Sequence, residues 1–245
     1  MGLSTAEQAH FFEYTRKVLN RMKRILFVGN SFTYYNDLPA MFESVAKAAG
    51  LDIEARMVTK GGWYLNRFAD PQDEMGQKLR EAYAQEKWDY VVLQDQSFNP
   101  AKNSRDLVES AKIIREMMNC GEQMLMYQTW SYQAGSEKLA ATGLTYKEMH
   151  DALKNAYQAA ADAIGGVCVP VGDAFSECFR RHPEIGLYCA DAFHPSPEGT
   201  YLAACSFYAA ISGKSPMELV TPEGVDDKAA EDLRKIADDV WQATK

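Results

Sequence analysis

Ser31, Asp191 and His194 are the residues whose types and spacing could support nucleophilic catalysis. Ser31 follows four apolar residues, 25–28, and the pair Gly29-Asn30. A serine hydroxyl is a poor nucleophile at neutral pH, so it needs a general base within hydrogen-bond reach and a group that orients this base. By itself, an Asn-Ser pair after a strand is also typical of a turn or a helix cap. Ser31 is therefore a candidate nucleophile only if a histidine and a carboxylate reach it.

His194 is the best-placed of the four histidines to act as that base. Asp191 precedes it by three residues, and in a turn this offset can place a carboxylate beside an imidazole. Asp191 could then hold the Nδ1 proton and leave Nε2 free to accept a proton from Ser31, which is worth about 10²–10⁴ in rate. The other histidines fall in the leading segment, inside an expected helix and in a surface turn: His10, His150 and His182.

An attacked carbonyl also needs hydrogen-bond donors for its developing negative charge, each worth roughly 10²–10³ in kcat. The candidates are the backbone N–H of Ser31, the backbone N–H of Gly62, and a side-chain amide that follows the third expected strand. Glycine suits such a role because it lets the backbone approach a ligand closely. The amide could come from Gln96 or from Gln94.

Alternating apolar runs and helical patterns are expected to position these residues. Strands are predicted at 24–28, 52–58, 90–93, 124–127 and 167–169. Helices are predicted at 37–49, around 72–87, and at 104–119, 145–164 and 196–213, with a last helix that carries apolar residues 233, 236, 237, 240 and 241 on one face. The expected N-caps are Asp37, Ser104, Thr145 and Ser196. The Thr145 cap includes a capping box with Glu148.

This alternation indicates an α/β fold, a parallel sheet covered by helices on both sides. Ligands of such sheets bind beyond the carboxyl ends of the strands. Polar or small residues follow the first four of these ends, at 29–31, 59–63, 94–97 and 128–130, and the Asp191–His194 segment comes later. We therefore expect the candidate groups to gather at one edge of the sheet.

The composition of the chain indicates which classes of protein and partner to expect. The chain has 245 residues, of which 47% are hydrophobic, and a net charge of −8. This composition favours a folded domain and disfavours nucleic acid as a partner. We expect a leading helical segment at 1–22 and a single domain at 23–245, and no feature predicts an oligomeric state.

No apolar run is long enough to span a membrane. The absence of a signal-peptide pattern predicts a cytoplasmic protein, or a secreted or periplasmic one if a leader has been removed.

Three sequence blocks resemble those of the SGNH hydrolases, the superfamily of GDSL-type esterases. "FVGNSFT" resembles the first block, "KGGW" the second and "DAFHPSPEGTYLAA" the last, and the resemblance extends over about 24–213. It implies a three-layer α/β/α sandwich of the flavodoxin-like kind around a central, mostly parallel five-stranded sheet. It also implies that Ser31 is the nucleophile, Gly62 an oxyanion-hole residue, Asp191 the acid and His194 the base.

Two departures from the family pattern matter. Asn30 stands where the first block normally has aspartate, which is not a catalytic group. The third block normally provides a Gly-x-Asn-Asp, and "VVLQDQSFNP" lacks it. Gln96 is the expected substitute for the missing asparagine, Gln94 is the alternative, and Asn99 lies farther beyond the strand. The "GNSFT" and "QxQS" pieces are similar to a branch of the superfamily that consists largely of uncharacterised bacterial proteins.

The sequence thus predicts a serine esterase that forms an acyl-enzyme on Ser31 and requires no metal or cofactor. The expected substrate is a small ester, with an acetylated sugar favoured by the nearby aromatic residues Tyr34, Tyr35, Trp63 and Trp130. The residues expected to contact substrate are Asn30, Trp63, Gln94 and Trp130. Two alternatives remain: a non-catalytic binding protein on the same fold, and a metal-dependent hydrolase with ligands from Asp173, His182, Asp191 and His194.

Overall fold

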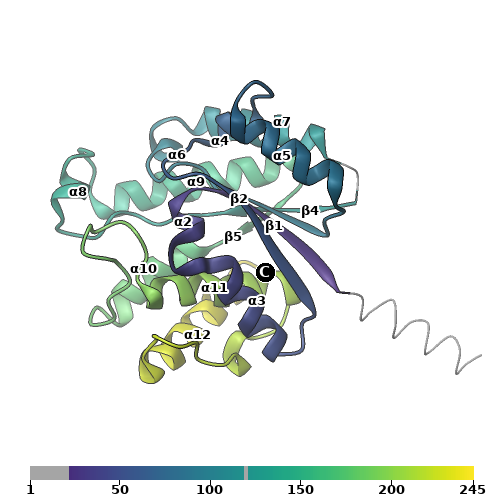
Figure 1. Cartoon of the computed structure of the whole chain (residues 1–245). Helices are drawn as coiled ribbons and strands as arrows, with labels where there is room; N and C mark the ends of the chain where they lie inside the picture. Colours follow the sequence, from purple (N-terminus) through teal and green to yellow (C-terminus); the bar gives the residue numbers. More distant parts are fainter. Residues whose placement is uncertain (1–21, 119–120) are drawn as a thin grey trace, which may run out of the picture.

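A parallel five-stranded sheet lies between two layers of helices in the computed structural model, which describes residues 22–118 and 121–245 (Figure 1). The leading segment expected at 1–22 falls outside these residues except for Met22. The strands are β1 (Lys23–Gly29), β2 (Ile53–Thr59), β3 (Tyr90–Leu93), β4 (Gln123–Tyr127) and β5 (Val167–Val169). All five predicted strands are present, so the α/β sandwich predicted from the sequence is confirmed.

The strand order is β2-β1-β3-β4-β5, and every pairing is parallel. This is the flavodoxin-like order, whose chain direction across the sheet reverses between β1 and β3. Residues Ile25–Val28 of β1 are at most 1% exposed, because helices cover both faces of this central strand. Ligand sites in such sheets form at the carboxyl ends of the strands on either side of the reversal, here the ends of β1 and β3.

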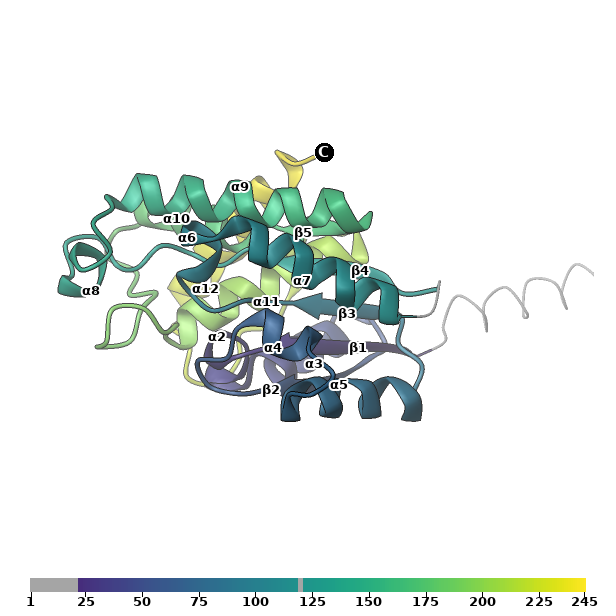
Figure 2. The ribbon, with the colours of Figure 1, turned by 90° about the horizontal axis from the view of Figure 1, so that it is seen from above.

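Figure 1 shows the helices in two layers, one on each face of the sheet, and Figure 2 looks down on one layer with the other behind the sheet. Helices α4, α5, α7 and α9 lie on one face of the sheet, and α3, α11 and α12 lie on the other. Their bounds are α2 (Ser31–Tyr34), α3 (Leu38–Ala48), α4 (Leu65–Ala69), α5 (Glu74–Gln85), α6 (Asn99–Lys102), α7 (Ser104–Met117), α8 (Glu137–Ala140), α9 (Tyr146–Ile164), α10 (Val171–Arg181), α11 (Pro197–Ser212) and α12 (Asp227–Gln242), with 3-10 turns at Tyr35–Asp37 and Pro216–Glu218.

Local sequence signals explain where most of these helices begin. The side chains of Asp37, Thr145 and Ser196 each accept a hydrogen bond from a backbone N–H of the first helical turn, and the capping box of Thr145 with Glu148 is complete. The expected cap at Ser104 is wrong: Ser104 is the first helical residue, and Asn103 precedes it without a side-chain cap.

Helix α10 was not predicted. Its buried residues Val171, Ala174, Phe175 and Cys178 have the spacing of one helical face. Pro170 and Gly172 at its start are typical of a loop, which hid this short amphipathic pattern. None of the helices in the described ranges is long and apolar enough to cross a membrane.

Candidate active site

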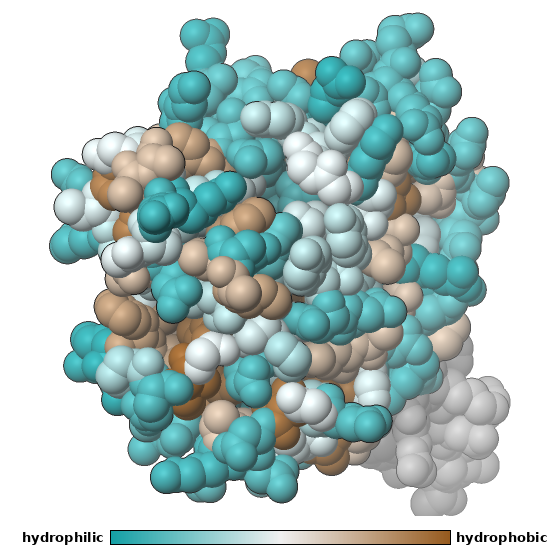
Figure 3. Space-filling model, turned by 60° about the vertical axis from the view of Figure 1, so that its left-hand side comes forward, coloured by the Kyte–Doolittle hydropathy of each residue, from teal (hydrophilic) through white to brown (hydrophobic). Residues whose placement is uncertain are grey.

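A cleft of about 360 Å³ opens at the carboxyl ends of β1 and β3. Figure 3 brings this side of the molecule forward and shows hydrophobic residues in small groups among hydrophilic ones. The residues that line the cleft come from segments far apart in the sequence: Asn30, Ser31, Tyr34, Tyr35, Gly61, Gly62, Gln96, Ser97, Lys138, Phe193 and His194. Ser31, Gly62, Gln96 and His194 therefore come together as the sequence predicts.

Ser31 is held at the end of β1 by a network of buried amides. Its predecessor Asn30 caps α2, with Oδ1 accepting from the N–H of Phe32 at 3.2 Å. Gln94 accepts from the N–H of Asn30 at 2.9 Å and donates to Asn30 Oδ1 at 3.0 Å. Gly29 is needed here because a Cβ at this position would lie 2.4 Å from Gln94 Oε1. The position of the Ser31 backbone is therefore set by β3 as well as by β1.

Asp191 and His194 form the pair that their spacing predicts. The Nδ1 atom of His194 lies 2.6 Å from Oδ2 of Asp191, and Oδ1 of the same carboxylate accepts from the backbone N–H groups of Phe193 and His194 at 3.2 and 3.0 Å. Burial raises the pKa of Asp191, but the hydrogen bonds from His194 and from these N–H groups outweigh it and lower the pKa. An ionised Asp191 fixes the tautomer in which Nδ1 carries the proton.

Aromatic rings hold the imidazole of His194 in place. Tyr35 stacks on it with ring centroids 4.0 Å apart and planes 1° apart, and Phe32 meets it edge-on at 5.7 Å. The Nε2 atom is buried and has no hydrogen-bond partner among the described residues, so no hydrogen bond joins it to Ser31. An unpartnered Nε2 in the same cleft as a serine hydroxyl is suited to accept a proton, because catalytic hydrogen bonds often tighten only when substrate binds.

Asn36 ties the serine segment to the histidine segment. Its Nδ2 donates to the carbonyl of Pro195 and to the hydroxyl of Thr200, both at 2.9 Å. Its backbone has a φ of +48°, a conformation that asparagine tolerates better than most residues. Asn36 therefore positions the two halves of the site relative to one another, a role that its sequence context did not reveal.

Gly62 and Gln96, the predicted oxyanion donors, line the same cleft as Ser31. Gly62 has a φ of +69°, which favours glycine at this turn. The Oε1 atom of Gln96 accepts from the N–H groups of Phe98 and Asn99 at 2.9 and 3.0 Å, so the Nε2 donor must point the other way. Nε2 makes one hydrogen bond, to Ser97 Oγ at 3.2 Å.

Asp95 is a buried positioning residue that the sequence analysis missed. It is 1% exposed, and its Oδ1 accepts from the N–H groups of Leu65 and Gln96 at 2.7 Å each, while Oδ2 accepts from Asn99. Burial raises the pKa of Asp95, although these hydrogen bonds oppose the change. This side chain joins the Gly62 loop to the Gln96 loop.

Gln94 and Trp130 are not placed to contact substrate, which corrects the sequence prediction. Both are 0% exposed. The Gln94 amide is fully used: besides its bonds to Asn30, it accepts from Thr33 at 3.0 Å and donates to the carbonyl of Asp95. Trp130 is stacked between Phe32 and Phe175, with parallel rings at 4.7 and 4.0 Å. Both predictions failed because strand-end residues in a parallel sheet can also point into its core.

Trp63 lies outside the cleft lining, and this too differs from the prediction. Its Nε1 donates to Asp73 at 3.2 Å, and Lys60 Nζ lies 3.9 Å from the ring centroid. Its backbone carbonyl nevertheless accepts from Asn30 Nδ2 at 3.0 Å, which joins the second sequence block to the first. Asn30 lines the cleft, and its contact with substrate stays a prediction.

Lys138, Ser97 and Phe193 line the cleft without having been singled out from the sequence. Phe193 is the residue before His194, so its proximity could have been expected. Lys138 lies on the short helix α8 and is brought to the cleft only by the packing of the loop after β4. No local pattern marks such a residue.

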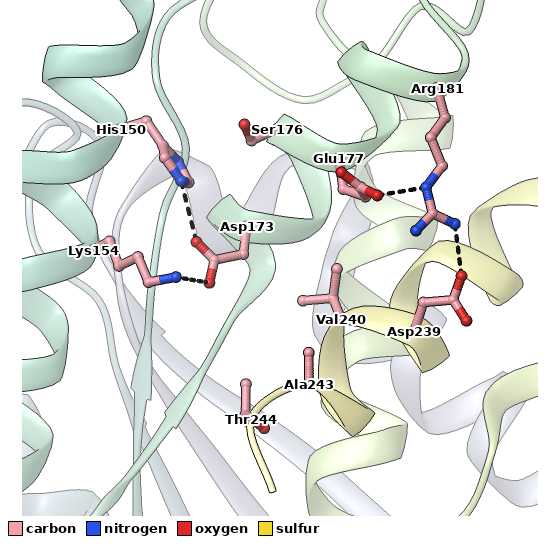
Figure 4. Close-up of a pocket in the computed structure, with 10 residues that line it drawn as sticks. All are labelled: His150, Lys154, Asp173, Ser176, Glu177, Arg181, Asp239, Val240, Ala243 and Thr244. Carbon is pink, nitrogen blue, oxygen red and sulfur yellow. Dashed lines mark hydrogen bonds and ion pairs between the residues drawn. The ribbon is translucent and has the colours of Figure 1, made fainter.

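The residues considered as metal ligands are not brought together. Asp173 bonds to His150 at 3.2 Å and to Lys154 at 2.8 Å in a second cavity, which Figure 4 shows. His182 lies 3.3 Å from Glu184, and Asp191 is bonded to His194. Among the described residues, no three potential ligand side chains form a metal-binding group. The arrangement of these side chains therefore does not favour the metal-dependent alternative.

Several solved structures are similar to this chain. A candidate SGNH hydrolase from Slackia heliotrinireducens superposes with a TM-score of 0.67 at 31% identity, covering 78% of this chain and 100% of that one. A DUF4886 family protein from Bacteroides uniformis has a TM-score of 0.74 at 21% identity (91% and 95% covered), and an acetyl xylan esterase has 0.55 at 14% (77% and 99% covered). No protein-family model and no curated protein matches the chain.

Proposed function

The chain belongs to the SGNH hydrolase superfamily, and from this premise we propose that it is a serine esterase acting on a small ester. The observation that carries the proposal is the contact of 2.6 Å between His194 Nδ1 and Asp191 Oδ2. The Nε2 atom of the same ring is buried and has no hydrogen-bond partner within the described residues, so it is free to accept the Ser31 proton. The Nδ1 side is held by a carboxylate, which is how a histidine is prepared as a general base.

The mechanism assigns one step to each group. Ser31 Oγ attacks the ester carbonyl while His194 Nε2 takes its proton, and Asp191 stabilises the imidazolium that results. The N–H groups of Ser31 and Gly62 and the Nε2 of Gln96 donate to the oxyanion. His194 then protonates the leaving alcohol, and water hydrolyses the acyl-enzyme by the same route in reverse.

The size of the cleft supports a small substrate. Its volume of about 360 Å³ lies near the lower end of the roughly 300–1,000 Å³ typical of ligand sites. Tyr34, Tyr35 and Phe193 provide aromatic walls that suit a sugar ring. An acetyl ester on a carbohydrate fits these dimensions, and an acetyl xylan esterase is among the chains that share the fold.

Labelling with a fluorophosphonate tests the nucleophile, and Ser97 provides the matched control because it lines the same cleft. We expect one adduct, mapped to Ser31 by mass spectrometry, that is lost in Ser31→Ala and kept in Ser97→Ala. Hydrolysis of p-nitrophenyl acetate should be lost in parallel. An adduct on another serine, or full hydrolysis by Ser31→Ala, would refute the assignment. A folded native protein that shows neither adduct nor hydrolysis would support the non-catalytic binding alternative.

A further inference from the structure

We propose that the alcohol part of the substrate carries a negative charge and that Lys138 recognises it. The proposal rests on the esterase function above and adds a substrate class to it. The preferred substrate would be an ester of an anionic alcohol, such as an acetylated acidic sugar.

The position of Lys138 is the first argument. Its Nζ atom lies 4.2 Å from the ring centroid of Phe193 and 5.5 Å from that of Tyr132, and the residue lines the cleft. Such cation–π contacts direct the flexible side chain without neutralising its charge. Within residues 22–118 and 121–245, Lys138 forms no ion pair with a carboxylate.

The charge balance of the cleft is the second argument. Lys138 is the one lysine or arginine among the lining residues, and no aspartate or glutamate lines the cleft in the described part of the chain. The lining thus carries one lysine charge in a protein whose net charge is −8, and the carboxylate of Asp191 behind it is engaged by His194 and by the N–H groups of Phe193 and His194. The second cavity, in Figure 4, is different: its Lys154 bonds to Asp173, and its Arg181 bonds to Glu177 and Asp239. Among the residues that the structure describes, Lys138 has no such partner, and an anionic ligand would supply one.

The third argument is which part of the ester Lys138 would meet. His194 must lie beside the leaving alcohol, because it protonates that oxygen, whereas the oxyanion donors Gly62 and Gln96 mark the carbonyl oxygen. Lys138 sits over Phe193, whose ring lies 4.0 Å from that of His194. The cation therefore lies beside the His194 end of the cleft, from which the alcohol leaves.

The test compares two acetates of similar shape, 3-acetoxybenzoate and the neutral 3-acetoxybenzamide. The quantity measured is the ratio of their kcat/KM values, in which differences in general catalytic competence cancel. We expect this ratio to fall about two- to fivefold in Lys138→Gln, the range for a charge pair near solvent, and about tenfold in Lys138→Glu, while Lys138→Arg keeps it. Added salt should lower the ratio of the native protein more than that of Lys138→Gln.

Lys147→Gln is the matched control, because Lys147 is an exposed lysine of α9 that is paired with Asp151 and does not line the cleft. It removes the same formal charge and should leave the ratio unchanged. A ratio that stays the same in Lys138→Gln and Lys138→Glu, with both acetates hydrolysed, would overturn the proposal while the esterase function stands. If the native protein hydrolyses neither acetate and forms no fluorophosphonate adduct, the esterase function itself fails, and this inference with it.

Discussion

Gln96→Glu separates the proposed catalytic role of Gln96 from its structural role. The Oε1 atom of Gln96 accepts from the N–H groups of Phe98 and Asn99 at 2.9 and 3.0 Å, and a glutamate keeps both of these bonds. The substitution replaces the Nε2 donor by a carboxylate oxygen, which can accept from the Ser97 hydroxyl and whose negative charge would also oppose an oxyanion. The folded state should therefore tolerate the change.

Gln96→Glu should change kcat strongly and the free energy of unfolding only slightly. Loss of one oxyanion donor costs roughly 10²–10³ in kcat, or about 2.7–4 kcal/mol of transition-state stabilisation. The unfolding free energy should change by less than about 1 kcal/mol, which for a chain of this length corresponds to a Tm change below about 4 °C. Gln96→Ala removes the donor and the two acceptor bonds together, so it should lower kcat and also destabilise the protein by about 1 kcal/mol.

Steady-state hydrolysis of p-nitrophenyl acetate gives kcat, and thermal denaturation gives Tm. The neutral acetate avoids repulsion between the new carboxylate and an anionic substrate. Native kcat in Gln96→Glu at an unchanged Tm would refute Gln96 as an oxyanion donor. A fall in kcat that merely follows a fall in Tm would show that Gln96 acts through the fold.

Three further predictions test the surroundings of the site. Tyr35→Ala removes the ring stacked on His194 at 4.0 Å and should lower kcat/KM about two- to tenfold, whereas Tyr35→Phe should keep it; equal loss in both variants would contradict stacking as the cause. Trp130→Ala should lower the free energy of unfolding by about 3–5 kcal/mol in urea titrations, because the ring is 0% exposed, and an unchanged stability would contradict its place in the core. Burial raises the pKa of Asp173, but hydrogen bonds from His150, Lys154 and Gln128 outweigh it and lower the pKa from its ordinary value of 3.8 to about 2. The ionised Asp173 therefore stabilises the folded state fully above about pH 4, and this stabilisation is lost as the pH falls toward 2. Between pH 5 and pH 2 the native protein should therefore lose about 1–2 kcal/mol more than Asp173→Asn, and parallel stability curves would refute this assignment.

Local sequence patterns determined the framework of this protein. The apolar run 25–28, the capping residues Asp37, Thr145 and Ser196, and the alternation of strands and helices predict the sheet and most of its helices. The Asp191–His194 pair was predictable too, because it depends on a three-residue offset within one turn. Such features rest on contacts between residues close in sequence, which a single chain segment encodes.

The assignment of polar and aromatic residues to the cleft or to the core was decided by the tertiary structure. Gln94 and Gln96 are two residues apart and chemically identical, yet the first is buried beneath Asn30 and the second faces the cleft. Trp130 points into the core, and Lys138 reaches the cleft from helix α8, far from Ser31 in the sequence. These outcomes depend on how segments far apart in the sequence pack against one another. The sequence therefore predicted which groups could do chemistry, and the packing decided which of them meet.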